Sequence, residues 1–197
     1  MAQLQGKVAI VTGAARGLGR AYAEAMAAEG AAILACDVNN CDDTIAAIRS
    51  AGGQAEGILT DIASMASCTA MAERAVSAFG RIDILVNNAA LYGGLKGARF
   101  ELLDEAQWDA VMNINVKGLW QCCKAVVGPM RESGGGSIIN ISSLAAVFGI
   151  ALSPGAGALK TSELVNAELE RLRRGFPEDL DYKVVYDTSL FVEASIE

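Results

Sequence analysis

Short apolar runs alternate with amphipathic stretches over the first 141 residues of the chain. The runs have the length and composition of buried strands, and they lie at residues 7–12, 31–37, 55–59, 82–86 and 137–141. The stretches between them have helical spacing, and they lie at residues 19–29, 42–50, 64–79 and 105–129. Strands that alternate with helices predict an α/β fold with a doubly wound parallel sheet flanked by helices.

The pattern changes near residue 149. Residues 149–157 form a glycine-rich apolar stretch, residues 160–174 a highly charged helix, and residues 181–186 a candidate strand. We therefore divide the chain into residues 1–148, which contain the alternating pattern, and residues 149–197, an atypical or truncated C-terminal segment. Because its helix and strand restore the αβ order, we expect this segment to pack on the same sheet or to complete it.

Composition limits the class of protein. With 197 residues, 52% of them hydrophobic, the chain can bury a core within one domain. No run approaches the ~20 apolar residues of a membrane span, and residues 1–7 lack the apolar core of a signal peptide. We therefore expect a cytoplasmic protein with no membrane partner. A net charge of −7 argues against nucleic acid as a partner, because phosphate backbones bind clustered positive charge.

The chain has five cysteines and no histidine. The number is odd and no pair has the spacing of a zinc motif, so we expect neither a disulfide framework nor a metal site. We interpret the cysteines as reduced thiols in the core.

A glycine-rich segment, residues 12–19, separates the first predicted strand from the first predicted helix and reads Thr-Gly-Ala-Ala-Arg-Gly-Leu-Gly. A pyrophosphate can bind there, because the first N–H groups of a helix lack intrahelical partners and lie at its positive end. Gly13 would allow the tight turn, Gly17 the approach of backbone to phosphate, and Gly19 the packing of helix on sheet. The position between strand and helix favours a Rossmann-like dinucleotide site over an ordinary βα turn.

Asp37 ends the second predicted strand, 18 residues after Gly19. A carboxylate there can accept hydrogen bonds from both ribose hydroxyls and repel a 2′-phosphate, which favours NAD over NADP. Arg16 is the opposing signal, because a guanidinium beside the loop can pair with that phosphate. The arginine can also be a solvated charge, and we rank the carboxylate above it.

The glycine loop, together with Asn87-Asn88-Ala89-Ala90, resembles the short-chain dehydrogenase/reductase family, and the resemblance spans about residues 4–148. It implies that Asp61 and Ile62 match the family's adenine-contacting pair. The cofactor-binding residues predicted in this way are Gly13, Arg16, Gly17, Leu18, Gly19, Asp37, Asp61, Ile62, Asn88 and Ala89. The predicted cofactor is NAD. The resemblance further implies a small-molecule alcohol or ketone as substrate and leaves a homo-oligomer open.

The resemblance extends to two catalytic residues. Asn115, in the long predicted helix, resembles the active-site asparagine, and Ser143 closes the fifth strand at the place of the active-site serine. In the family a tyrosine 13 residues after the serine exchanges the proton, and a lysine four residues later lowers its pKa. Those places hold Ala156 and Lys160, and alanine cannot exchange a proton. Without the resemblance, Asn115 could satisfy helix backbone at a kink and Ser143 could make a turn.

Tyr92 and Lys96 have the spacing of the family's tyrosine and lysine by themselves. They lie in a glycine-rich segment after the fourth strand, whereas the family pair lies on a helix after the fifth, so we interpret the match as coincidental. Tyr182 and Tyr186 have no lysine four residues later. No other tyrosine therefore replaces the missing one by its pattern.

Two explanations account for Ala156. One is a tyrosine-to-alanine substitution in an otherwise normal enzyme that retains Lys160. The other is a fused tail, because residues 149–197 resemble part of the periplasmic porter domain of resistance-nodulation-division efflux transporters. We favour the fused tail, in which Lys160 matches the family spacing by coincidence.

Three functions stay open at this point. The first is an NAD-dependent oxidoreductase of secondary alcohols or ketones, impaired by the missing tyrosine. The second is a catalytically silent dinucleotide-binding module, and the third is a chimeric or truncated product with no selected activity. The motifs favour family membership, and Ala156 is the reason that catalysis is in question.

Overall fold

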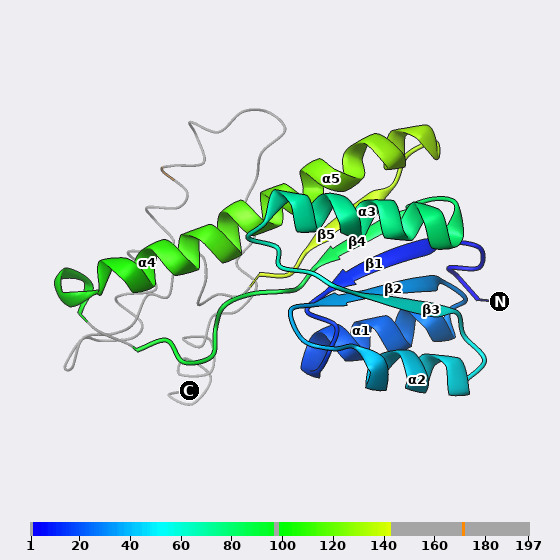
Figure 1. Ribbon diagram of the computed structural model, residues 1–197, viewed down its shortest axis with the longest axis horizontal. Helices are drawn as coiled ribbons and strands as arrows, with labels where there is room; N and C mark the ends of the chain where they lie inside the picture. The colour runs from blue at the N-terminus through cyan, green and yellow to red at the C-terminus, as the bar shows by residue number, and fades with distance from the viewer. Residues whose placement is uncertain (1, 97–98, 143–170, 172–197) are drawn as a thin grey trace, which may run out of the picture. The chain divides into compact units, whose positions relative to one another are not determined.

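The computed structural model describes residues 2–96, 99–142 and 171 of the chain. Within these residues the centre is a five-stranded sheet in which neighbouring strands pair in parallel (Figure 1). The strands are β1 (Val8–Thr12), β2 (Ala32–Asp37), β3 (Ala55–Leu59), β4 (Ile84–Asn87) and β5 (Ser137–Asn140). Their order across the sheet is β3-β2-β1-β4-β5. The predicted doubly wound parallel sheet is confirmed.

Helices cover both faces of the sheet, with α1 and α2 on one face and α3 and α5 on the other (Figure 1). The helical segments are α1 (Gly17–Ala28), α2 (Asp42–Ser50), α3 (Met65–Phe79), η1 (Phe100–Leu102), α4 (Glu105–Val111), η2 (Met112–Gly118) and α5 (Leu119–Glu132). α3 shows how the sequence sets such bounds. Ser64 caps its first turn by accepting a hydrogen bond from the Ser67 N–H, and Gly80 ends it in the left-handed region.

Alternation of side chains along each strand divides the core into two layers. The layer that packs against α1 and α2 includes Ala9, Val11, Ala23, Ile33 and Ile48. The layer that packs against α3 and α5 includes Ile10, Leu34, Met71, Leu85 and Val126. β1 is buried along its whole length, as expected for a central parallel strand with helices on both sides.

The predicted single helix over residues 105–129 is wrong in one respect. α4 passes into η2, a π-helical segment, and then into α5, which continues to Glu132 with Pro129 inside it. A π-helical turn closes its hydrogen bond one residue later than an α-helical turn. Amphipathic spacing does not distinguish the two over seven residues, so the pattern predicted one continuous helix.

Asp83 joins the amino ends of β1 and β4. The residue is 4% exposed. Its carboxylate accepts hydrogen bonds from the Val8 N–H at 3.0 Å, from Arg81 at 2.6 and 2.8 Å, and from Lys7 at 3.3 Å. Burial by itself would raise the pKa of Asp83. The hydrogen bonds from these three residues outweigh burial and hold the pKa below its usual value.

All five cysteines are free thiols, as predicted, and all except Cys123 are buried. Burial, followed by the nearby Asp37 and Asp42 carboxylates, raises the pKa of Cys41 to about 11. Burial also raises the pKa of Cys36. Both thiols therefore stay protonated at neutral pH.

The chain divides into two units, Met1–Ile141 and Ser142–Glu197. The first unit contains every element named above. The helix and strand predicted after residue 149 lie outside the described residues, apart from Arg171, so the boundary at residue 149 stays a prediction. Of the helices in the described part of the chain, none has the length and apolar character to span a bilayer.

Candidate functional site

Two loops meet at the carboxyl ends of β1 and β4. The glycine loop, residues 12–19, follows β1, and Asn88 follows β4, which pairs directly with β1. The strand order changes direction here, because β2 and β3 lie on one side of β1 and β4 and β5 on the other. In open α/β sheets, ligands bind outside the carboxyl ends of strands at such a switch point. The predicted phosphate loop therefore lies at the ligand position of the fold.

Three positions of the glycine loop favour glycine, two because of their backbone angles and one because there is no space for a Cβ atom. Gly13 and Gly17 have φ angles of +70° and +58°, which side chains rarely adopt. At Gly19 the reason is space, because a Cβ there would overlap the carbonyl oxygen of Gly13 and lie 2.6 Å from Asn88 Nδ2. The helix begins at Gly17 rather than at the predicted Gly19. Gly17 and Gly19 therefore both lie in its first turn.

The start of α1 is open to an outside partner. No side chain caps this helix, and its first turn contains no acidic residue. Arg16, the residue before it, is exposed, and Leu18 is 64% exposed. The N–H groups of a first turn take their partners from outside the helix, and its positive end favours an anion.

Thr12 ties the two loops together. Its buried hydroxyl donates to the Val86 carbonyl at 3.2 Å and accepts from the N–H groups of Asn88 and Ala89, each at 3.1 Å. The Asn88 amide donates in turn to the carbonyl oxygens of Thr12 at 3.0 Å and Gly13 at 3.3 Å. Asn88 and Ala89 therefore fix the backbone of the glycine loop. Thr12 was not predicted, although a polar residue at the end of a buried apolar strand is a signal for such a role.

Asp37 ends β2 beside the glycine loop. Its Oδ2 atom accepts a hydrogen bond from the Ala15 N–H at 3.1 Å. Its Oδ1 atom accepts from the N–H and the Nδ2 group of Asn39 at 2.9 and 3.1 Å. The residue is partly exposed, and an ionised carboxylate has about four acceptor positions. Asp37 can therefore accept a further hydroxyl donor next to the loop.

Asp61 and Ile62, after β3, have different surroundings. Asp61 is exposed and accepts a hydrogen bond from the Ala63 N–H at 2.9 Å. Ile62 is 5% exposed and packs so closely on η2 that a Cβ at Gly118 would lie 2.9 Å from its Cγ1 atom. Its carbonyl accepts from Gln121 Nε2 at 2.9 Å. Asp61 is therefore the member of the predicted pair that is open to a ligand.

Asn115 lies in η2 and bonds to the segment after β4. Its Oδ1 atom accepts from the Leu91 N–H at 2.7 Å, and its Nδ2 group donates to the Leu91 carbonyl at 3.1 Å. Gln107 on α4 makes the same two kinds of bond with the backbone of Lys96, at 2.9 and 3.0 Å. These amides fasten residues 91–96 to α4 and η2 at two points. Gln107 was not predicted, because a glutamine on an exposed helix face gives no signal of such a contact.

Asn87, the last residue of β4, has a buried amide at the same edge of the sheet. Its Nδ2 group donates to Asn140 Oδ1 at 2.9 Å and to the Cys123 thiol at 3.3 Å. Its Oδ1 atom is, within the described residues, the one buried side-chain oxygen or nitrogen without a hydrogen-bond partner. A water or a ligand donor can satisfy such an atom.

The remaining predicted catalytic position is not described. Ser143 lies outside the described residues, and so do Ala156 and Lys160. Tyr92 is described and is 79% exposed. The roles assigned to Ser143 and Ala156 therefore stay predictions.

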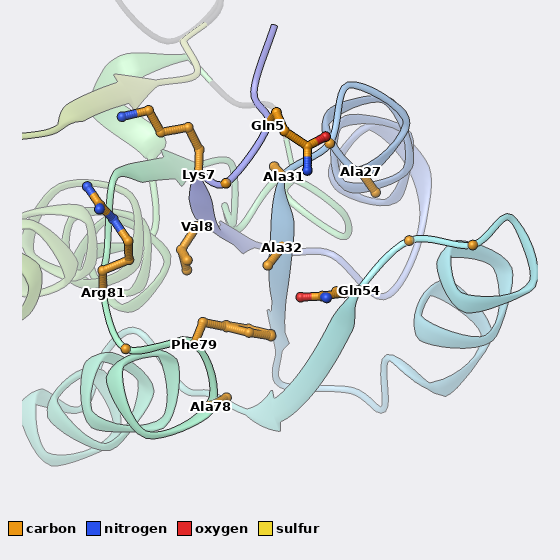
Figure 2. A pocket seen from close by; sticks show the side chains of 15 residues that line it. Gln5, Lys7, Val8, Ala27, Ala31, Ala32, Gln54, Ala78, Phe79 and Arg81 are labelled. Carbon is orange, nitrogen blue, oxygen red and sulfur yellow. The ribbon is translucent and has the colours of Figure 1, made fainter. Parts of the chain in front are cut away.

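A cavity of about 550 Å³ lies at the opposite, amino-terminal edge of the sheet (Figure 2). Lys7, Ala32, Gln54 and Arg81, which lie at or just before the starts of strands, line part of it. Figure 2 shows the side chains of Gln54 and Phe79 extending into this space. None of the predicted cofactor-binding residues lines the cavity, so it is separate from the glycine-loop edge.

Comparison with known proteins decides the family. A sequence profile described as short chain dehydrogenase matches residues 7–161, which is most of the chain. The chain belongs to the short chain dehydrogenase family. The family resemblance predicted from residues 4–148 is therefore confirmed.

Two of the similar proteins, D-threitol dehydrogenase and carveol dehydrogenase, are named for different substrates. The short-chain reductase protein NovJ of Streptomyces niveus is 47% identical over 145 residues, 72% of this chain and 54% of NovJ. D-threitol dehydrogenase of Mycolicibacterium smegmatis is 42% identical over 150 residues, 75% of this chain and 56% of the relative. The crystal structure of carveol dehydrogenase from Mycobacterium avium in complex with NAD matches with a TM-score of 0.70 and 29% identity, over 73% of this chain and 57% of that one. The chain thus spans little more than half the length of the curated relatives.

A second profile, of the AcrB/AcrD/AcrF family, matches residues 131–197. The predicted resemblance of the tail to efflux transporters is therefore confirmed, although this match begins before residue 149. The two profiles overlap over residues 131–161, a range that includes Ala156 and Lys160.

Proposed function

We propose that this short chain dehydrogenase binds NAD(H) at the glycine-loop edge and acts on a secondary alcohol or ketone, with turnover impaired by alanine at position 156. The observation that best supports cofactor binding is the close packing of the glycine loop against Asn88. A Cβ at Gly13 would lie 2.8 Å from Asn88 Nδ2, and a Cβ at Gly19 would overlap the loop itself. This packing and the uncapped start of α1 are what a dinucleotide site needs, because its pyrophosphate must approach the backbone closely.

The residues of the edge have separate roles in this proposal. N–H groups of the loop and of the first turn of α1 would hold the pyrophosphate, and Asp37 would accept the ribose hydroxyls. Asp37 also repels a 2′-phosphate, whereas the exposed Arg16 would attract one, so the proposed preference for NAD rests on the carboxylate. The NAD complex of carveol dehydrogenase supports a nicotinamide dinucleotide. When bound, the cofactor supplies the hydride chemistry.

The proton is the step in which this chain differs from its family. Hydride addition to a ketone carbon requires a proton at the oxygen, and a positioned acid contributes about 10²–10⁴-fold to such a step. Asn115 and Ser143 are the proposed remaining catalytic residues. Because Ala156 carries no exchangeable proton, we expect turnover to be lower than that of a relative with tyrosine by a factor of this order.

A second candidate function is a catalytically silent dinucleotide-binding module in a chimeric chain. The AcrB/AcrD/AcrF match over residues 131–197 favours it. On this account residues 1–148 bind the dinucleotide, and residues 149–197 are a segment of other origin.

We also propose that the chain self-associates through α4, η2 and α5. These segments expose apolar side chains every fourth residue, at Trp108, Met112, Val116 and Trp120. Glu105 lies at the beginning of this surface and Lys124 toward its end, so an antiparallel second copy would bring opposite charges together. Sedimentation of the wild type and of Trp120→Lys tests this, and a monomeric wild type would contradict it.

NADH fluorescence, followed by turnover assays with a panel of secondary alcohols and ketones, tests the proposed function. We expect NADH to bind and turnover to be weak. Ala156→Tyr should raise turnover if a point substitution explains the alanine, and should leave turnover unchanged if the tail is foreign. An absence of NADH binding would overturn both candidate functions, and rapid turnover by the wild type would overturn the impairment.

A further inference from the structure

A buried hydroxyl interrupts the inward face of α2. Three residues follow the spacing of an apolar stripe: Cys41 at the N-cap position, and Thr44 and Ile48 within the helix. They are 5%, 0% and 2% exposed. Thr44 is the polar member of that stripe. Its Oγ1 atom donates a 2.8 Å hydrogen bond to the carbonyl oxygen of Ala14, in the glycine loop.

The hydrogen bond from Thr44 is one of three that fasten the middle of the glycine loop to β2 and α2. The Ala14 N–H donates to the Cys36 carbonyl at 3.1 Å, so both polar backbone groups of Ala14 are held. The next N–H, that of Ala15, donates to Asp37 Oδ2 at 3.1 Å. The position of the Asp37 carboxylate relative to the loop thus depends on where Ala14 and Ala15 are held.

We propose that Thr44 is a positioning residue for cofactor discrimination. By fixing Ala14 it sets the spacing between the glycine loop and the Asp37 carboxylate, and so contributes to the preference for NADH over NADPH. This inference rests on the proposed NAD(H) site.

The effect on discrimination follows from what each cofactor gains at Asp37. NADH gains hydrogen bonds from its ribose hydroxyls to a carboxylate held at the right distance from the pyrophosphate. NADPH gains nothing there, because its 2′-phosphate is repelled by the same carboxylate. When the loop loses its anchor to α2, any change at the pyrophosphate affects both nucleotides alike, whereas only NADH also loses its hydrogen bonds at Asp37. The preference for NADH therefore falls.

A purely structural role for Thr44 predicts something else. Removing the hydroxyl leaves the buried Ala14 carbonyl without this partner, which costs stability. A loss of folded protein lowers the apparent binding of both cofactors by one factor. The ratio of the two dissociation constants is therefore the quantity that separates positioning from structure.

The test uses the full-length protein and fluorescence titrations with NADH and with NADPH. Thr44→Val keeps the shape of the side chain and removes the hydroxyl, whereas Thr44→Ser keeps the hydroxyl. Thr69→Val is the matched control, because the Thr69 hydroxyl donates to the Met65 carbonyl at 3.0 Å on the exposed side of α3. Circular dichroism gives the folded fraction of each variant, and Thr44→Ala serves if the valine variant does not fold.

We expect Thr44→Val to weaken NADH binding about 3- to 10-fold more than NADPH binding, the range for one hydrogen bond. Thr44→Ser should restore the wild-type ratio, and Thr69→Val should not change it. An unchanged ratio in folded Thr44→Val would overturn the inference while leaving the cofactor site standing. A wild type that binds neither nucleotide would overturn both.

Discussion

The side-chain amide of Asn88 donates a 3.0 Å hydrogen bond to the carbonyl oxygen of Thr12, and the Thr12 hydroxyl accepts the backbone N–H of Asn88 at 3.1 Å. These two bonds join the end of β1 to the residue after β4, and Thr12 and Asn88 are 76 residues apart in the chain. They hold the glycine loop in one conformation whether or not Asn88 touches the cofactor. The pair therefore links the fold to the proposed binding site.

Asn88→Ala removes both side-chain bonds to the loop. We expect it to lower the free energy of unfolding by about 1–3 kcal/mol, because two carbonyl oxygens lose a donor, and to weaken NADH binding. Urea unfolding and an NADH titration measure the two effects. Asn113→Ala is the control, since Asn113 is exposed on η2 and we expect a change within about 0.5 kcal/mol. Unaltered NADH affinity in Asn88→Ala would show that the loop does not depend on this contact.

Gly19→Ala tests the close packing of α1 against the glycine loop. An alanine in a helix is normally more stable than glycine by roughly 0.5–1 kcal/mol. At Gly19 the added Cβ would overlap the Gly13 carbonyl oxygen, so we expect lower stability and a loss of NADH affinity of about tenfold or more. Gly128→Ala on α5 meets nothing within 4 Å and should be neutral or stabilising in thermal unfolding. A gain of stability at Gly19 equal to that at Gly128 would contradict the packing.

Asp83→Asn tests the cluster that joins β1 to β4. We expect the free energy of unfolding to fall by about 1.5–3 kcal/mol at pH 7, because the charged donors Arg81 and Lys7 lose their negatively charged acceptor. The pKa of Asp83 is lowered in the folded protein, so its contribution is present above the unfolded-state value of 3.8 and is lost as the pH falls through the folded value. Urea unfolding at pH 7 and at pH 3 should show a smaller difference between the variant and the wild type at the lower pH.

Glu101→Gln provides the matched control for that experiment. Its partner Arg99 is 80% exposed, and an exposed pair contributes about 0–1 kcal/mol. A loss for Asp83→Asn no larger than that for Glu101→Gln would mean that the buried carboxylate does not stabilise the sheet.

The parallel sheet and the site edge could be predicted because their signals are local. Buried strands such as β1 are short continuous apolar runs, and the glycine loop has a fixed spacing between a strand and a helix. Parallel strands then bring the residues after β1, β2 and β4 to one edge. The places of the glycine loop, Asp37 and Asn88 followed from that topology alone.

The contacts that hold the edge together could not be predicted, because they join residues far apart in the chain. Thr44 reaches Ala14 across 30 residues, and Asn115 reaches Leu91 across 24. The π-helical segment could not be predicted for a different reason: its hydrogen-bond pattern leaves the amphipathic spacing nearly unchanged. A threonine on an otherwise apolar helix face is the one sequence signal that could have led to Thr44.

The position of bound NADH is most directly tested by NMR of protein labelled with ¹⁵N-glycine. Gly13, Gly17 and Gly19 report on the proposed site, and Gly53 and Gly80 report on the cavity at the other edge of the sheet. We predict that saturating NADH shifts the amide signals of the three loop glycines and leaves those of the cavity glycines in place. Shifts confined to Gly53 and Gly80, or no shift at any glycine, would contradict dinucleotide binding at the glycine loop.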